Sequence, residues 1–157
     1  MLLVGEQPGD REDRAGEPFV GPAGIVLRRI LEAVDVDLND VYMTNAVKHF
    51  KHEVRGKRRL HKKPNAAEIE ACHPWLDAEL DAVRARVIVT LGATAARSLL
   101  GTTVPIAANR GNQFDLDGRM LFITYHPSAV LRSDERSAEI RQALTDDLRA
   151  ASRHAEA

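Results

Sequence analysis

The sequence predicts a three-layer α/β/α sandwich built on a mostly parallel, four-stranded central sheet. Its 157 residues correspond to a single domain over 1–157, and 44% hydrophobic residues are sufficient for one packed core. Only 4% of the residues are aromatic, so the core must consist mainly of aliphatic side chains, as in layers of helices on a sheet. Four apolar segments of strand length alternate with segments of helical periodicity, and such crossovers return each strand in the same direction.

The composition also indicates the cellular compartment in which we expect the protein. The single cysteine, Cys72, excludes a disulfide within this chain. No segment approaches the roughly 18 consecutive apolar residues that span a bilayer, and residues 1–4 are too short and uncharged for a signal peptide. We therefore expect a soluble, cytoplasmic protein with no membrane partner. Nothing in the sequence indicates oligomerisation, so we expect a monomer.

The first half of the chain predicts two strands and one helix. Residues 2–5 form a short apolar strand that leads into a long Gly- and Pro-rich loop over 5–24. A helix follows over 23–35, because its apolar residues recur at helical spacing and its charged residues lie on the opposite face. The β-branched and aromatic residues of 41–47 predict the second strand.

The middle of the chain predicts a capped helix, a buried strand and a short second helix. Asn65 is the expected N-cap of the first helix, and Glu68, three residues later, suits a capping box. Residues 87–91 are continuously apolar, which is typical of a buried parallel strand. Gly92 then turns the chain into the short helix over 93–100.

The C-terminal part predicts the fourth strand and the last helix. The pair Asp117-Gly118 indicates a hairpin-like excursion over 111–119. Residues 121–125 form the fourth strand. An amphipathic helix then runs from about residue 135 to about residue 151.

Charge is unevenly distributed along the chain. The net charge is −1, but residues 48–63 contain eight Lys or Arg and one acidic residue, Glu53, a local charge of +7. The other 141 residues carry −8. Such a basic segment in an acidic domain indicates a patch for an anion, and a polyanion is the obvious ligand. The charge alone leaves a solvated loop as the alternative.

Polar, turn-forming residues follow each predicted strand. The strand ends carry the segment 5–10, then Asn45, then a glycine, then the segment 126–128. Ligands of parallel sheets bind beyond the carboxyl ends of the strands, so this edge is the predicted active site. The first segment lacks the Gly-Lys-Ser/Thr ending of a phosphate loop. Its carboxylates, Glu6 and Asp10, suit a base for water or a stabiliser of a developing cation, unless they are ordinary loop residues.

Four separated motifs resemble those of the iron–sulfur uracil-DNA glycosylases. They occur in the family's order: Gly5-Glu6-Gln7-Pro8-Gly9-Asp10 with its continuation to Gly24, Thr44-Asn45-Ala46-Val47-Lys48, Lys57-Arg58-Arg59-Leu60-His61-Lys62, and His126-Pro127-Ser128 through Arg132. The third motif is similar to the insert of the UdgX branch, which cross-links itself to DNA containing uracil. Gln7 and the run Lys48-His49-Phe50 also indicate that branch.

The resemblance implies a pocket that takes one nucleotide out of DNA and holds its base. By similarity, Phe19 stacks on the flipped uracil, Asn45 bonds the O4 and N3–H edge, and His126 bonds O2 as negative charge collects on the leaving base. The implied catalytic residues are His61, Glu6, Gln7, Asp10 and His126. The implied substrate contacts are Phe19, Asn45, Gly5, Ser128, Arg132, Lys57, Arg58 and Arg59.

His61 carries the unusual step that the resemblance implies. In the UdgX branch this histidine attacks the sugar C1′ after uracil leaves, and the protein remains bonded to the abasic site. A neutral imidazole is a competent nucleophile, and Glu6 would orient or deprotonate it.

Three functions remain open for the sequence. The protein is a cross-linking glycosylase, an ordinary turnover glycosylase whose His61 does not react, or a non-catalytic DNA-binding remnant. Without its neighbouring motifs, His61 would be no more than a phosphate contact. In each case the expected partner is DNA, single- or double-stranded, so we expect association with the nucleoid.

The resemblance also implies a metal cluster for which most ligands are missing. The family normally holds a 4Fe–4S cluster through four ligands, usually cysteines. Cys72 matches one ligand position, and His49 stands where most relatives have a second cysteine. The remaining pair belongs, in the family, to a segment that precedes the first strand. We therefore expect that the chain is truncated at its start or has lost the cluster. For Cys72 the alternative is a buried small hydrophobe on a helix face.

Overall fold

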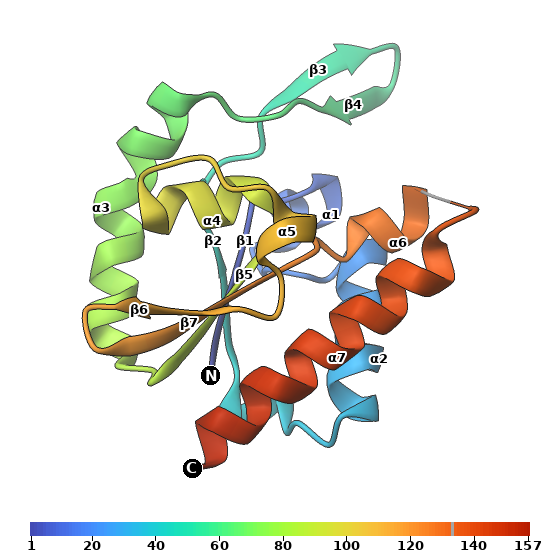
Figure 1. Ribbon diagram of the computed structural model, residues 1–157. Helices are drawn as coiled ribbons and strands as arrows, with labels where there is room; N and C mark the ends of the chain where they lie inside the picture. The colour runs from blue at the N-terminus through green and yellow to red at the C-terminus, as the bar shows by residue number, and fades with distance from the viewer. Residues whose placement is uncertain (133) are drawn as a thin grey trace.

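The computed structural model describes residues 1–132 and 134–157, which form a five-stranded sheet with helices on both faces (Figure 1). The strand order in space is β2-β1-β5-β7-β6. The first four of these strands are parallel, and β6 is antiparallel to β7. Their bounds are β1 (Leu2–Gly5), β2 (Tyr42–Asn45), β5 (Val87–Leu91), β6 (Gln113–Leu116) and β7 (Arg119–Thr124). The predicted mostly parallel α/β architecture is confirmed.

Helices α3 and α4 pack on one face of the sheet, and α2 and α7 pack on the other (Figure 1). The helices of the described residues are α1 (Asp10–Ala15), α2 (Pro22–Ala33), the short 3-10 helix η1 (Leu38–Asp40), α3 (Ala66–Val83), α4 (Ala93–Leu100), α5 (Ile106–Asn109), α6 (Ser128–Arg132) and α7 (Ser137–Glu156). None of these helices combines the length and the apolar character that a membrane crossing requires.

The internal strands β1 and β5 are mostly apolar because both faces of the sheet are covered. Leu3 and Val89 pack in the cluster that includes α2 and α7, whereas Leu2 and Ile88 pack in the cluster that includes α3 and α4. Every residue of β5 is buried, which explains its continuous apolar run. The carboxyl ends of the parallel strands point to one edge of the sheet, where α1, α6 and the strands β3 and β4 also lie (Figure 1).

Elements with strong apolar or capping signals lie where the sequence predicts them. Strand Val87–Leu91 and helix Ala93–Leu100 have the predicted bounds. The capping box is also present: Asn65 Oδ1 accepts from the Glu68 N–H at 2.9 Å, and Glu68 Oε2 accepts from the Asn65 N–H at 2.8 Å. The last helix runs beyond its predicted end, to Glu156.

The predicted number of strands in the sheet is wrong by one. The excursion over 111–119 contains β6, which pairs with β7 and forms a fifth strand at the sheet edge. Asp117 and Gly118 have φ angles of 52° and 78°, so both residues of the turn are left-handed. The strand has only four residues and no buried one, so it lacks the apolar run that marks the other four strands.

Two segments predicted as loops contain regular structure. The first is the Gly- and Pro-rich segment, in which Asp10–Ala15 forms α1 without a single buried residue. The second is the basic segment, which contains the antiparallel hairpin β3 (His52–Arg55) and β4 (Arg58–His61). Its turn uses Gly56 with a φ of 60°. Both elements lie on the surface, so their sequences carry no apolar periodicity.

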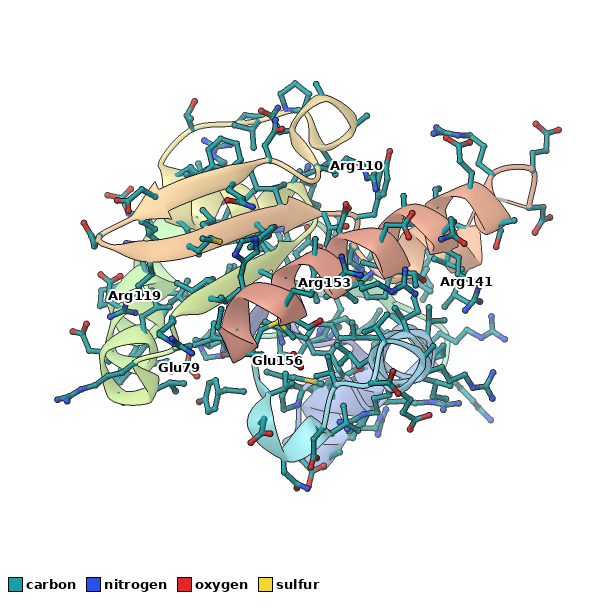
Figure 2. The ribbon with its side chains drawn as sticks, turned by 60° about the horizontal axis from the view of Figure 1, so that its bottom comes forward. Glu79, Arg110, Arg119, Arg141, Arg153 and Glu156 are labelled. Carbon is teal, nitrogen blue, oxygen red and sulfur yellow. The ribbon has the colours of Figure 1, made fainter. Side chains whose placement is uncertain are left out.

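A buried carboxylate joins the end of β7 to α7 and to the segment after α5. Asp147, only 3% exposed, accepts hydrogen bonds from the Thr124 hydroxyl at 2.6 Å and from Arg110 Nε at 3.0 Å. Arg110, which reaches toward α7 (Figure 2), also donates to the Ala143 carbonyl at 3.0 Å. Thr124 is the last residue of β7, so these contacts hold the strand end from which the predicted active-site segment 126–128 leaves.

We expect Asp147→Ala to lower the free energy of unfolding by about 2–3 kcal/mol, because Arg110 and Thr124 lose their shared acceptor in a buried position. Asp146→Ala is the matched control, since Asp146 is the exposed neighbour on the same helix and pairs only with surface groups. It should cost at most about 0.5 kcal/mol. Urea unfolding of both variants measures the difference, and equal losses would contradict a structural role for the buried carboxylate.

Candidate active site

A cavity of about 860 Å³ opens at the carboxyl ends of the parallel strands. This is the edge at which open α/β sheets bind their ligands. Its lining brings together residues from seven separate segments of the chain. They include Glu6, Gln7, Asp10, Phe19, Asn45, His61, Thr94, His126, Ser128 and Arg132.

Two glycines allow Phe19 and Asn45 to approach each other at the cavity wall. A Cβ atom on Gly5 would lie 2.5 Å from Asn45 Oδ1 and 2.6 Å from the Phe19 ring, so a side chain there would displace both residues. A Cβ atom on Gly24 would lie 1.9 Å from the Phe19 carbonyl oxygen. Phe19 itself has a φ of 54°, an unusual conformation that the tight packing around it maintains. The result is a flat aromatic face beside a fixed amide.

The backbone of Asn45 is held from behind by a polar cluster. The Lys48 ammonium donates to the Asn45 carbonyl at 2.7 Å and to the Thr44 hydroxyl at 2.7 Å, and it also pairs with Glu79. Asn45 is 8% exposed, so its amide is one of the few polar groups buried at this edge. An amide offers both a donor and an acceptor, so it suits a ligand edge with the complementary pair.

His126 presents a neutral imidazole with a defined tautomer. Its Nδ1 accepts from the Ser128 N–H at 3.1 Å and lies 2.7 Å from the Ser128 hydroxyl, so the ring proton is on Nε2. Burial lowers the pKa of His126 to about 4, although the negative charge of Glu6 acts in the opposite direction. The ring centroid is 6.2 Å from that of Phe19. His126 therefore supplies a neutral N–H donor at neutral pH.

Glu6 lies between a helix and the hairpin. Its Oε1 is 2.9 Å from His61 Nε2, and its Oε2 accepts a hydrogen bond from the Thr94 hydroxyl. Burial by itself raises the pKa of Glu6, but the hydrogen bonds from His61 and Thr94 outweigh it and bring the pKa below its usual value. The carboxylate is therefore ionised at neutral pH, and the His61 imidazole, about half exposed, faces it from β4.

The base of the hairpin is attached to the end of β1 through Gln7. The Gln7 amide donates to the carbonyls of Lys51 and Lys62, at 3.1 and 3.2 Å, and accepts from the Lys51 N–H at 3.3 Å. Lys51 and Lys62 flank the two hairpin strands. One buried amide therefore holds both ends of the segment that carries His61.

Arg59 attaches the hairpin to α1. Its guanidinium lies 2.6 Å from Asp10 Oδ1 and 2.7 Å from Asp13 Oδ2. The guanidinium carbon also lies over the Phe50 ring, 5.2 Å from the ring centroid. Asp10 also accepts from Arg14, and these two arginines lower the pKa of its carboxyl group. The Asp10 carboxylate thus shares its charge between two arginines at the cavity rim.

A model of the uracil DNA glycosylase superfamily matches residues 1–149. The chain belongs to this superfamily. It is 37% identical over 150 residues to a type-4 uracil-DNA glycosylase of Thermotoga maritima, covering 94% of this chain and 73% of that protein. It is 35% identical over 155 residues to a type-4 uracil-DNA glycosylase of Pyrobaculum aerophilum, with 92% and 74% covered. A type-5 uracil-DNA glycosylase of the same organism is 36% identical over 98 residues, with 60% and 39% covered.

The uracil DNA glycosylase fold of this chain brings most of the predicted site residues to one cavity but not all of them. Gly5 lies behind Asn45 and Phe19. Lys57 and Arg58 are exposed at the turn end of the hairpin, outside the cavity lining. Arg132 lies at the cavity on α6.

Three further residues belong to the site through contacts that the sequence does not predict: Thr94, Lys48 and Asp13. Lys48 lies in the second motif, but the sequence does not predict its bonds to Asn45 and Glu79. Thr94 follows a glycine at a strand end, a position that points to the same edge of the sheet. Asp13 lies in the continuation of the first motif, but the sequence does not predict its pairing with Arg59.

The residues present do not complete the ligand set of a 4Fe–4S cluster. Cys72 is buried, and its Sγ accepts from the Lys48 N–H at 3.4 Å, next in the chain to the exposed His49. Within 1–132 and 134–157 no three His, Cys, Asp or Glu side chains are grouped as a metal site. Two neighbouring candidates are half of the four ligands that such a cluster takes. We derive no catalytic step from a cluster.

We expect an NMR titration of His126 to have its midpoint near pH 4, the pKa that burial imposes. A histidine in the unfolded chain has a pKa of about 6.5, so the unfolded state binds the proton first as the pH falls. The folded state should therefore lose stability between about pH 6.5 and pH 4. His126→Gln should remove both the signal and this contribution. A midpoint close to the ordinary histidine value would contradict the enclosed, neutral ring.

Proposed function

We propose that the protein is a UdgX-type uracil-DNA glycosylase that excises uracil from DNA and becomes covalently attached to the abasic site through His61. Membership of the superfamily makes it a DNA glycosylase. One observation carries the finer proposal: His61 reaches the cavity edge and lies 2.9 Å from the Glu6 carboxylate. The carboxylate gives the ring proton of His61 an acceptor, as a histidine that acts as a nucleophile requires.

The cavity wall is suited to uracil. A glycosylase must flip the target nucleotide out of the stack, at a cost of a few kcal/mol, and then hold the base in a pocket. Phe19 offers the stacking face, and the Asn45 amide accepts from N3–H and donates to O4. Cytosine presents the opposite pattern at these two atoms, so the same amide orientation leaves both groups unpaired.

Cleavage of the glycosidic bond leaves negative charge on the base and positive charge on the sugar. His126 is placed to stabilise the first charge and Glu6 the second. The bond between C1′ and the uracil N1 breaks, and its electron pair moves onto the base. The His126 Nε2–H donates to uracil O2, where negative charge collects. The sugar becomes an oxocarbenium ion, and the Glu6 carboxylate stabilises it electrostatically.

His61 then captures the sugar. An imidazole nitrogen supplies the electron pair of the new bond to C1′, which neutralises the oxocarbenium ion. The ring proton that faces Glu6 passes to that carboxylate, so atoms and charges balance without another reactant. Glu6 therefore serves first the cleavage and then the capture.

DNA binding is attributed to the basic side chains around the cavity. Lys57 and Arg58 on the hairpin and Arg132 on α6 are exposed and carry positive charge for phosphates. Binding of this kind weakens steeply as salt rises, because counterions are released on association. A substrate of this class also implies that the protein works in contact with the nucleoid.

We expect His61→Ser to abolish the covalent adduct while uracil is still released, because the base pocket, Glu6 and His126 remain intact. A uracil-containing oligonucleotide is incubated with each protein and resolved on a denaturing gel. The parent should give a heat-stable, shifted band, and His61→Ser should give abasic DNA that alkali cleaves.

His52→Ser is the matched control for that experiment. His52 is paired with His61 in the hairpin register, but its ring stacks on Phe50 and its Nδ1 lies 2.9 Å from the Phe50 carbonyl, so this variant should still form the adduct. An adduct that survives His61→Ser removes His61 from its role. Abasic DNA without any adduct from the parent indicates a turnover glycosylase, and salt-sensitive binding without uracil release indicates a non-catalytic protein.

We expect Asn45→Ala to slow uracil excision by roughly tenfold to a hundredfold and to lower the preference for uracil over cytosine, since the base edge loses both bonds. Single-turnover excision from matched oligonucleotides measures both rates. Asn39→Ala, a surface substitution next to Asp37, is the control and should have no effect. A variant that selects uracil as well as the parent does would contradict the pocket assignment.

A further inference from the structure

We propose that Thr94 is a positioning residue: its hydroxyl holds one oxygen of Glu6 so that the other oxygen faces His61. The consequence for cross-linking rests on the function proposed above. The hydrogen bond itself is a property of the free protein and is testable without DNA.

The two oxygens of Glu6 have separate partners of very different exposure. Oε2 accepts from Thr94, which is 4% exposed and is the second residue of α4. Oε1 meets His61, whose side chain is 49% exposed on the surface hairpin. Helix α4 has four buried residues, whereas the hairpin strands have none. The orientation of the carboxylate is therefore set from the Thr94 side.

The position of the Thr94 hydroxyl is set by close packing at the start of α4. Gly92, the residue before this helix, has a φ of 92°, and a Cβ atom there would lie 3.0 Å from the His126 Cβ. The helix therefore starts directly against the segment that carries His126. The same close approach brings Thr94 next to Glu6, at the end of the neighbouring strand β1.

Thr94 also contributes to keeping Glu6 ionised. The titratable groups that act on Glu6 are His61 from β4 and His126 from the segment after β7, and Thr94 adds a neutral donor from α4. Burial raises the pKa of Glu6, and the hydrogen bonds from His61 and Thr94 lower it. Removal of the Thr94 hydroxyl should therefore raise the pKa of Glu6 and move the acid limb of adduct formation to higher pH.

The test compares Thr94→Val, which keeps the shape and removes the donor, with Thr94→Ser, which keeps the donor. Ser98→Ala is the matched control, because Ser98 is also buried on α4 and, among the described residues, its hydroxyl has no hydrogen-bond partner. Circular dichroism confirms folding, and Thr94→Ala replaces Thr94→Val should the latter not fold. The readouts are the NMR titration of the Glu6 carboxyl group and the single-turnover rates of uracil release and of adduct formation across pH.

We expect Thr94→Val to raise the pKa of Glu6 and to slow adduct formation by about tenfold or more, with a smaller effect on uracil release. Thr94→Ser and Ser98→Ala should behave like the parent. An unchanged Glu6 titration in Thr94→Val, or equal loss in Thr94→Ser, overturns the proposal. Absence of the adduct from the parent protein overturns the proposed function instead, and the Glu6 titration still decides the role of Thr94.

Discussion

The hydrogen bond between Glu6 and His61 joins residues that are 55 positions apart, and the proposed capture of the sugar depends on it. The hairpin that carries His61 has no buried residue, so apolar packing does not hold it in place. Polar contacts hold it instead. The Gln7 amide binds the base of the hairpin, and the Arg59 guanidinium on β4 pairs with Asp10. Such contacts open at a lower free energy than the core does, so His61 lies on a part of the cavity wall that is less firmly held than the core.

The accuracy of the fold prediction follows the distribution of apolar surface. Strand Val87–Leu91 and helix Ala93–Leu100 are packed against other layers, and their patterns give their bounds correctly. Helix α1, hairpin β3–β4 and strand β6 have no buried residues, so their sequences lack the apolar periodicity that burial requires. The backbone hydrogen bonds of these surface elements require no apolar face. Hydrophobic periodicity therefore does not predict these elements.

The candidate site was predictable as far as sheet geometry determines it. Glu6, Asn45 and His126 follow parallel strands, and strands of this kind end at one edge, so their gathering in one cavity follows from the chain order. His61 lies on a hairpin that no rule of sheet geometry directs to the cavity, and only its resemblance to a family motif pointed there. The bond from Thr94 depends on tertiary packing in the same way. The catalytic roles of all these residues remain predictions.

Burial shifts the pKa values of two titratable groups in the cavity in opposite directions: it lowers the pKa of His126 and raises that of Glu6. It leaves His126 neutral, with a pKa of about 4, whereas hydrogen bonds keep Glu6 ionised in spite of it. The difference is useful in the proposed reaction. A protonated His126 would attract the Glu6 charge and weaken its field at the sugar, where positive charge develops. In the proposed reaction, a neutral N–H donor would stabilise the departing base without that loss, so the enclosed ring of His126 would leave the field of the Glu6 carboxylate at C1′ unreduced.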